Sequence, residues 1–182
     1  MRTITARIGG KTYTATAITT ATARETIRVM EELEAARKAA LALGAWSGPA
    51  EIAAAVRARL RCDEREAALI CRVFRDRFSP DEAEDSLTRA ELDGLTAQIS
   101  AAVGELAAAH GPSAAPSGTP QTASEAMDKL YHTLATALRW PIYQIDAADF
   151  ESLLRFVFYK DPDVRIINGK TYRRAVGVPT WL

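Results

Sequence analysis

The sequence predicts a mainly α-helical protein that also carries small β-hairpins. Apolar residues recur at helical spacing through most of its 182 residues, whereas strict alternation is confined to the two ends. A stretch rich in Gly, Pro and Ser separates two sets of helices, and each set begins with its own capping signals. We therefore expect an N-terminal hairpin packed on a helical bundle, followed by a small C-terminal helical module with a terminal hairpin.

The N-terminal residues have the pattern of a β-hairpin. Ile4, Ala6 and Ile8 alternate with polar residues, two glycines follow at residues 9–10, and a second alternating run ends at Ala17. A Gly-Gly pair between alternating runs is typical of a two-residue hairpin turn. A hairpin alone is only marginally stable, so its apolar face must pack on the helices that follow or pair with another chain.

Capping signals mark the first and later helices of the larger part. Thr22 with Glu25 has the spacing of a capping box and predicts a helix that runs to the glycine at residue 44. Ser79, followed by Pro80 and by a glutamate at residue 82, predicts a short helix. Thr88 repeats the capping pattern, and the apolar periodicity after it indicates a helix to about residue 108.

The middle of the chain, residues 49–78, holds one or two helices. Pro49 suits the first turn of a helix, and Asp63 or Glu66 can cap a second segment. The first segment has an apolar side made of three aliphatic residues, Ile52, Val56 and Leu60. The second has an apolar face made of Ala67, Ile70, Phe74 and Phe78. The sequence leaves open whether the two segments join into one bent helix.

Composition divides the chain into three parts. Residues 1–109 form the helical domain with its hairpin, residues 110–122 form a flexible linker rich in Pro, Gly and Ser, and residues 123–182 form an aromatic-rich extension. Thr122 caps the first helix of the extension, and Trp140 with the following proline interrupts it. Asp146 and Asp149 favour a second helix start. An Asn-Gly pair at residues 168–169 predicts the terminal hairpin.

The charge balance argues against nucleic acid and anionic membranes as partners. Lys plus Arg and Asp plus Glu are both 23, so no net field attracts a polyanion at long range. A run of arginines crosses the middle helices: Arg57, Arg59, Arg61, Arg65, Arg72, Arg75 and Arg77. Acidic residues interleave with it, which is typical of a solvated, ion-paired helix surface. The C-terminal group Arg165, Lys170, Arg173 and Arg174 lacks such acids and is the better basic patch.

No pattern in the sequence carries catalysis, a cofactor or a metal. Two Gly-Lys-Thr triplets, at residues 10–12 and 169–171, lack the earlier glycine of a phosphate-binding loop and sit in predicted turns. His110 and His132 have no metal-binding neighbours at the required spacing. Cys62 and Cys71 fall on opposite faces of a helix, so we expect unpaired, inert thiols. We therefore predict a protein that is not an enzyme and that binds no cofactor.

The stretch VFRDRFSPDEAEDSLTRAELDGLTAQISAAVGEL combines a Phe-containing helix, a short acidic helix and a final amphipathic helix, with key positions Phe74, Phe78, Asp81, Leu87, Leu92, Ile99 and Val103. This order of elements resembles the tail assembly chaperones of long-tailed bacteriophages in their extended, frameshift-type form, and these are the matching positions. In LYHTLATALRWPIYQIDAADFESLL, which is similar to the extension of that family, they are Leu130, Tyr131, Leu134, Trp140, Ile145, Asp146, Asp149, Phe150 and Leu153. Arg139, before Trp140, stands where a glycine is expected.

The resemblance implies a role in tail morphogenesis. The helical domain would bind the tape-measure protein, and the extension would recruit tail-tube (major tail) subunits. The residues expected to contact the tube protein are Trp140, Tyr143 and Trp181, because exposed aromatic residues are common anchors of protein interfaces. Self-association is a further expectation. The chain lacks an apolar stretch of membrane-spanning length and an apolar signal segment, so we expect it in the host cytoplasm and not in the mature virion.

Two other functions remain open on the sequence. One is a small helical regulator that binds nucleic acid through the arginine run between residues 57 and 77. The other is a structural tail component that stays in the virion. Steep salt dependence of binding would favour the first, and presence in purified particles would favour the second.

Overall fold

The computed structural model describes residues 3–44, 47–110, 122–159, 164–167 and 170–173. Over these residues the chain is mainly helical with two antiparallel hairpins, so the predicted fold class is confirmed. In chain order the elements are β1 Ile4–Ile8, β2 Lys11–Ala15, α1 Thr20–Leu41, α2 Pro49–Val73, α3 Pro80–Ser86, α4 Arg89–His110, α5 Ala123–Ala137, α6 Ile142–Ala147, α7 Phe150–Val157, β3 Val164–Ile167 and β4 Lys170–Arg173.

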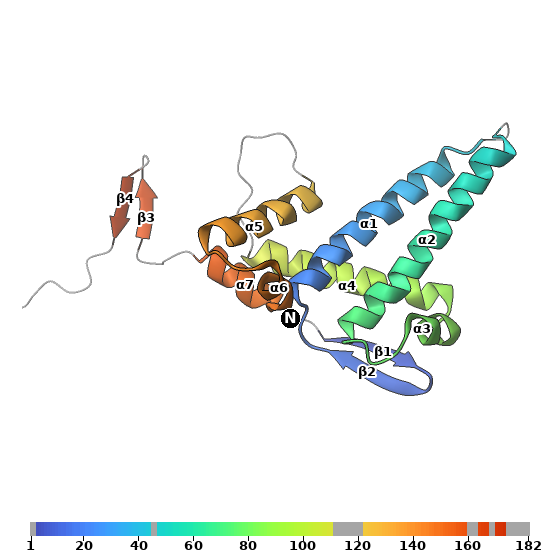
Figure 1. Ribbon diagram of the computed structural model, residues 1–182, viewed down its shortest axis with the longest axis horizontal. Helices are drawn as coiled ribbons and strands as arrows, with labels where there is room; N and C mark the ends of the chain where they lie inside the picture. The colour runs from blue at the N-terminus through green and yellow to red at the C-terminus, as the bar shows by residue number, and fades with distance from the viewer. Residues whose placement is uncertain (1–2, 45–46, 111–121, 160–163, 168–169, 174–182) are drawn as a thin grey trace, which may run out of the picture.

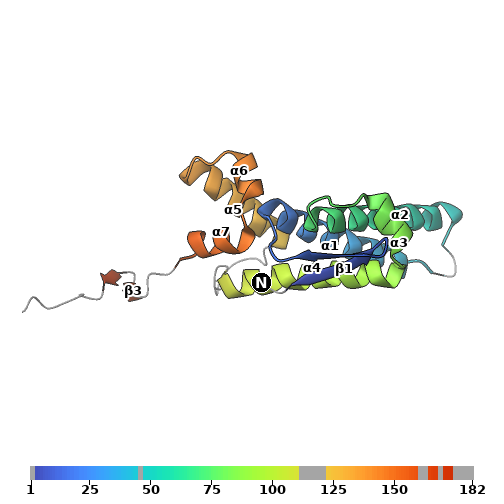
Figure 2. The same cartoon turned by 90° about the horizontal axis from the view of Figure 1, so that it is seen from below.

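The long helices form two layers. Helices α1 and α2 run antiparallel as a helical hairpin, and α4 crosses beneath them (Figure 1). Figure 2 shows α1 and α2 in one layer and α4 in the other. The end of the helical hairpin, where α1 finishes and α2 begins, extends away from the rest of the body, and α5, α6 and α7 gather at the other end of α1. This arrangement leaves the far part of α1 and α2 with little cover.

The N-terminal hairpin forms as predicted and packs on the helices. Its register pairs Ile8 with Lys11 across the turn, where Gly9 and Gly10 have φ angles of 55° and 77°. Both angles lie in the left-handed region that a turn of this kind requires and that glycine adopts at little cost. The three apolar side chains of β1 are buried, and the ring of Tyr13 packs edge-on against two phenylalanines of the α2–α3 connection. The hairpin therefore closes one end of the core.

The predicted start of the first long helix is wrong, and the structure decides the alternative that the sequence left open for residues 49–78. Helix α1 begins at Thr20, and Thr19 rather than Thr22 is its N-cap, with its side chain accepting from the backbone N–H of Thr22 at 3.2 Å. Helix α2 is one continuous helix, so Asp63 and Glu66 are interior residues and cap nothing. Each forms ion pairs with arginines instead, which satisfies carboxylates that a sequence pattern alone assigns to a cap.

Most of the other capping predictions are confirmed, although Asp146 lies inside α6 and caps no helix. Ser79 and Thr122 each complete a capping box with the glutamate three residues later, and Asp149 caps α7 through the backbone N–H of Ser152 at 2.9 Å. Thr88 exchanges hydrogen bonds with the glutamate three residues on, at the start of α4. Trp140 lies in the interruption between α5 and α6. Helix α4 continues through His110, which the sequence placed in the linker.

Helices on the two sides of the predicted linker share one hydrophobic core. Near the start of α1 the backbone pairs with the chain just before α7: Thr20 donates to Ala148 O at 2.9 Å, and Phe150 donates to Ile18 O at 2.9 Å. A single apolar cluster joins α1, α2 and α4 to eight buried side chains of the extension: Met127, Leu130, Tyr131, Leu134, Ile145, Phe150, Leu153 and Leu154. The predicted linker also leads us to expect that residues 1–109 fold alone. This stays a prediction, and the shared core opposes it.

Candidate protein-binding surfaces

One group of uncovered apolar side chains lies where α5, α6 and α7 meet. We call it the aromatic surface, and it consists of Leu138, Trp140, Ile142, Tyr143, Phe156 and Tyr159. Trp140 is half-buried, and the other five are exposed. Its aromatic members have the residue types that most often anchor protein interfaces. Contiguous exposed apolar patches on a folded chain are a recognised mark of interaction sites.

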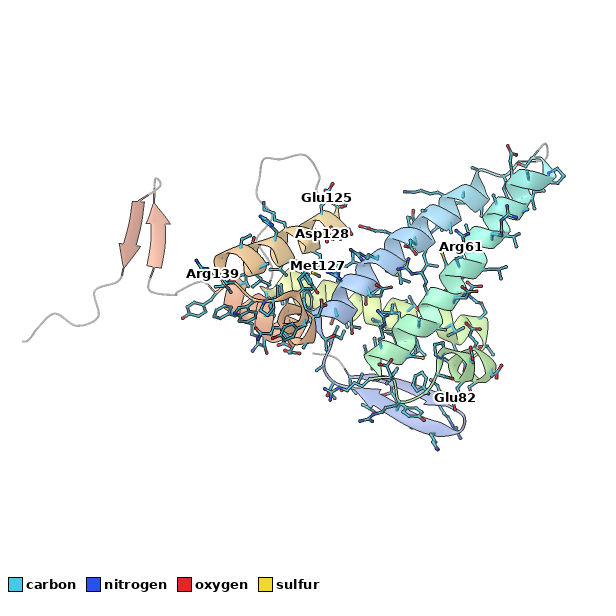
Figure 3. The ribbon with its side chains drawn as sticks, viewed as in Figure 1. Arg61, Glu82, Glu125, Met127, Asp128 and Arg139 are labelled. Atoms are coloured by element: carbon cyan, nitrogen blue, oxygen red, sulfur yellow. The ribbon has the colours of Figure 1, made fainter. Side chains whose placement is uncertain are left out.

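A left-handed residue shapes the aromatic surface. Arg139 has φ 55°, and the backbone N–H of Trp140 reaches back to the carbonyl of Leu134 at 3.4 Å, which ends α5. Reversals of this kind usually use glycine, so the sequence expectation of a glycine here had a conformational basis. Figure 3 shows Arg139 at the end of α5 that points away from the α1–α2 hairpin. The turn brings the Trp140 ring onto Phe156, with ring centroids 6.2 Å apart and planes only 8° from parallel.

The residues expected to contact the tube protein differ in how exposed they are. Tyr143 is 70% exposed and available to a partner. Trp140 contributes one side of the stacked pair and is in part covered by it. Trp181 lies outside the described residues. Phe156 and Tyr159 were not among the expected contacts, although the periodicity contained the signal, because the buried face of α7 accounts for its other large side chains.

A buried polar contact holds α5 and α6 together beneath this surface. The Tyr131 hydroxyl donates to Asp146 at 2.6 Å, and the Arg24 guanidinium of α1 lies 4.4 Å from the centroid of the Tyr131 ring. Burial, followed by the nearby Asp146 carboxylate, raises the pKa of Tyr131 well above its ordinary value. The phenol therefore stays protonated and acts as a donor, which fixes α6 against α5 and both against α1.

A second group of exposed apolar side chains lies on the far part of the α1–α2 hairpin. We call it the hairpin-tip face, and it consists of Leu41, Ile52, Val56 and Leu60. The sequence grouped the three α2 residues on one apolar side of the helix, and the structure leaves that side largely uncovered: Val56 is 53% exposed. The face of α2 that meets α1 is instead lined by small residues, among them Ala58 and Cys62. Because the periodicity of α2 supports two apolar faces, only the tertiary contacts decide which one is covered.

An ion-pair cluster lies at the base of the hairpin, between α2 and α4. Arg89 contacts Asp63 at 2.7 Å and also contacts Glu66 and Asp93, and Arg59 contacts Asp63 at 3.0 Å and Asp93 at 3.3 Å. Glu66 is only 1% exposed, and this burial, with the charge of Asp93, raises its pKa to about 7. Three carboxylates face two guanidinium groups here, so the cluster carries an excess negative charge when Glu66 is ionised.

The arginine run is paired at several points with acidic residues. Besides Arg59 in the cluster, Arg65 contacts Glu25 at 2.9 Å and also contacts Glu32, both on α1. Figure 3 shows Arg61 between α1 and α2. These contacts confirm the predicted ion-paired character of the run for Arg59 and Arg65. Guanidinium groups held by carboxylates are less available to phosphates.

The described residues offer neither an activated thiol nor a cluster of metal ligands. Cys62 and Cys71 are both buried and unpaired, and burial raises the pKa of Cys71 to about 11, so this thiol is a poor nucleophile. Across the described parts of the chain, no group of three His, Cys, Asp or Glu side chains is placed to hold a metal ion. None of the helices in those same ranges is long and apolar enough to cross a membrane.

Comparisons with protein-family models, with curated proteins and with solved structures gave no match to this chain. The two surfaces described above therefore carry the functional argument by themselves.

Proposed function

We propose that this protein is a bacteriophage tail assembly chaperone that binds the tape-measure protein and recruits tail-tube subunits during tail morphogenesis. The observation that carries the proposal is that one body presents two exposed apolar surfaces far apart. The hairpin-tip face lies at the free end of α1 and α2, and the aromatic surface lies at the end formed by α5, α6 and α7 (Figure 1). A protein that joins two different partners needs two such separate contact sites.

The size and composition of the two surfaces favour transient contacts. Each offers only a few large apolar side chains surrounded by charged ones, which suits weak and repeated binding better than one permanent interface. Weak contacts to two partners also allow the chaperone to be displaced once the tube subunits polymerise. In this proposal the protein acts in the host cytoplasm, is absent from the mature virion and catalyses no reaction.

Two observations weigh against the nucleic-acid alternative. The sequence has no net charge, and two arginines of the middle run are held by carboxylates. A phosphate-binding surface needs several unpaired cations, and its affinity falls steeply with added salt. A structural component of the virion would use the same two surfaces, and it is distinguished by its presence in purified particles.

The test is co-purification of the full chain with each tail protein, using variants of each surface. We expect Trp140→Ala and Tyr143→Ala to reduce capture of the tube protein and to leave capture of the tape-measure protein unchanged, because both side chains belong to the aromatic surface. Lys129→Ala, an exposed change on α5, is the control. If the wild-type chain captures neither protein, or if the control loses as much capture as Tyr143→Ala, the proposal is wrong.

Self-association is tested in the same preparation. Sedimentation of the full chain and of Val56→Asp shows whether the hairpin-tip face pairs with a second copy. A concentration-dependent increase in mass for wild type alone would assign that face to self-association.

A further inference from the structure

A groove opens where the α1–α2 hairpin rises from α4. Its cavity has a volume of about 480 Å³ and is lined by all three helices. Met30 and Leu33 of α1 and Ala97 of α4 form an apolar wall, and Glu66 and Asp93 lie on its acidic side. The cavity is thus apolar along one wall and acidic along another.

The hairpin-tip face continues this groove toward the free end of α1 and α2. At about 100° per residue, Ile52 lies within about 20° and Val56 within about 60° of Arg59 around the helix axis, and Arg59 lines the cavity. By the same geometry, Leu41 lies about 40° from Arg37, which lines the cavity from α1. Apolar side chains therefore extend along both helices on the side that faces α4. From Ile52 to Glu66 the groove is about 21 Å long.

A buried hydroxyl, that of Thr96, lies at the inner end of the groove beside the Glu66 carboxyl group. Thr96 lines the cavity and is only 2% exposed, and its Oγ1 makes no hydrogen bond of normal geometry within the described residues, although it lies beside Glu66. Among the side chains that line the cavity, three are acidic (Glu34, Glu66 and Asp93) and two are basic (Arg37 and Arg59). Arg89 contacts Glu66 and Asp93 from α4, and Asp63 belongs to the same cluster, so four carboxylates face three guanidinium groups in all. The groove therefore has room for one more positive charge when Glu66 is ionised.

We propose that this groove binds an amphipathic helix of a partner protein, with the apolar face of that helix on α1 and α2 and a lysine side chain directed into the acidic inner end. Two adjacent helices with an apolar strip between them present the surface that a third helix packs against. The groove length matches a helix of about fourteen residues. The lysine stem suits the apolar wall, and its ammonium group suits Glu66, Asp93 and the Thr96 hydroxyl. This inference adds to the proposed function a binding site for a partner helix on the α1–α2 hairpin. It rests on the proposed function only for the identity of that partner.

The probe is a synthetic amphipathic helical peptide of about sixteen residues, slightly longer than the groove. It carries leucine and alanine on one face, glutamine and glutamate on the other, and one lysine near one end. A matched peptide has norleucine in place of the lysine. Binding of each labelled peptide to the full chain is measured by fluorescence anisotropy.

We expect the full chain to bind the lysine peptide and Val56→Asp to weaken binding by about tenfold or more, because it places a charge in the apolar strip. Ala54→Asp is the matched control. Ala54 is exposed on the same helix about 160° away from Val56, so binding there should stay within about twofold of wild type. Absence of binding to wild type, or equal losses in the two variants, overturns the proposal.

The proposed contact between the peptide lysine and Glu66 is tested separately, by the pH dependence of peptide binding. The groups that face Glu66 are Arg59 and Asp63 of α2 and Arg89 and Asp93 of α4, and Glu34 and Arg37 of α1 line the same cavity. A lysine favours ionised Glu66, so binding of the lysine peptide should tighten between pH 6 and 8, about fivefold more than binding of the norleucine peptide. Glu66→Gln should remove that difference. Equal pH dependence of both peptides on wild type would overturn the lysine assignment, whereas a failure of the proposed function appears separately in co-purification with the tail proteins.

Discussion

The hairpin-tip face and the aromatic surface differ in what supports them. The hairpin-tip face lies on regular helices whose contact with each other is lined largely by small residues, and no further helix or strand within the described ranges covers it. The aromatic surface lies directly on the shared core, where Ile145, Phe150 and Leu154 are buried beneath α6 and α7. A surface on a projecting pair of helices can be altered with little effect on folding. A surface that rests on the core cannot be separated so easily from stability.

The strongest test of this comparison removes the extension, whose buried side chains support the aromatic surface. A chain that ends at His110 lacks the eight buried side chains that the extension adds to the core. Because burial of each contributes about 1.5–3 kcal/mol, and ordering the extension offsets much of that sum, the shared core predicts a net loss on the order of 5 kcal/mol or more. This opposes the expectation from the linker that residues 1–109 fold alone. Urea unfolding followed by circular dichroism distinguishes them: a cooperative transition at the wild-type midpoint would support an independent domain.

The ion-pair cluster beneath the hairpin predicts a pH-dependent stability. The unfolded chain releases the Glu66 proton near the ordinary pKa of 4.5, whereas the folded chain holds it to about 7. The folded state binds more protons between these values, so the free energy of unfolding falls as pH rises through this window, by about 3 kcal/mol. Glu66→Gln should remove this component and be more stable than wild type at pH 8. Urea unfolding at pH 5 and pH 8 measures it, and identical pH profiles for the two proteins would contradict the prediction.

The left-handed backbone conformation of Arg139 predicts a smaller effect, a gain in stability when this residue is replaced by glycine. Arg139→Gly removes the cost of a side chain at φ 55° and should stabilise the protein by about 1 kcal/mol. Ala126→Gly adds a glycine inside the same helix and should destabilise it by about 1 kcal/mol. Thermal unfolding of both variants gives the sign of each change. A lower melting temperature for Arg139→Gly would mean that its side chain contributes more than its backbone conformation costs.

The smallest expected effects concern the exposed members of the two surfaces. Val56→Ser and Tyr143→Ser should each change the free energy of unfolding by less than about 0.5 kcal/mol, because neither side chain is covered. Leu69→Ala, in the buried part of α2, is the contrast and should cost about 2–5 kcal/mol. Denaturant midpoints of the three variants suffice. A large loss for Val56→Ser alone would indicate that the hairpin-tip face is buried in solution, for example against a second copy.

The first hairpin turn and most of the helix ends could be predicted from the sequence, because interactions between residues a few positions apart determine them. The glycines at residues 9–10 supply the positive φ angles that a tight turn needs, and Ser79, Thr122 and Asp149 supply the oxygen atoms that helix ends need. Tyr143, which the sequence analysis named as a contact residue, is exposed, while its role in binding stays a prediction. Each of these features depends on residues a few positions apart, which a sequence displays directly.

The tertiary structure alone decided which apolar faces are covered. Periodicity shows that Ile52, Val56 and Leu60 form a strip on α2, but α1 covers the small-residue side of that helix instead. Periodicity also could not show that Thr19, the N-cap of α1, pairs through its backbone with Asp149, which lies far away in the sequence. Such contacts join residues far apart in sequence, and they are selected by the total area that all the helices bury together. The sequence by itself therefore determined the helices and their ends, and the packing determined which surfaces remain free to bind.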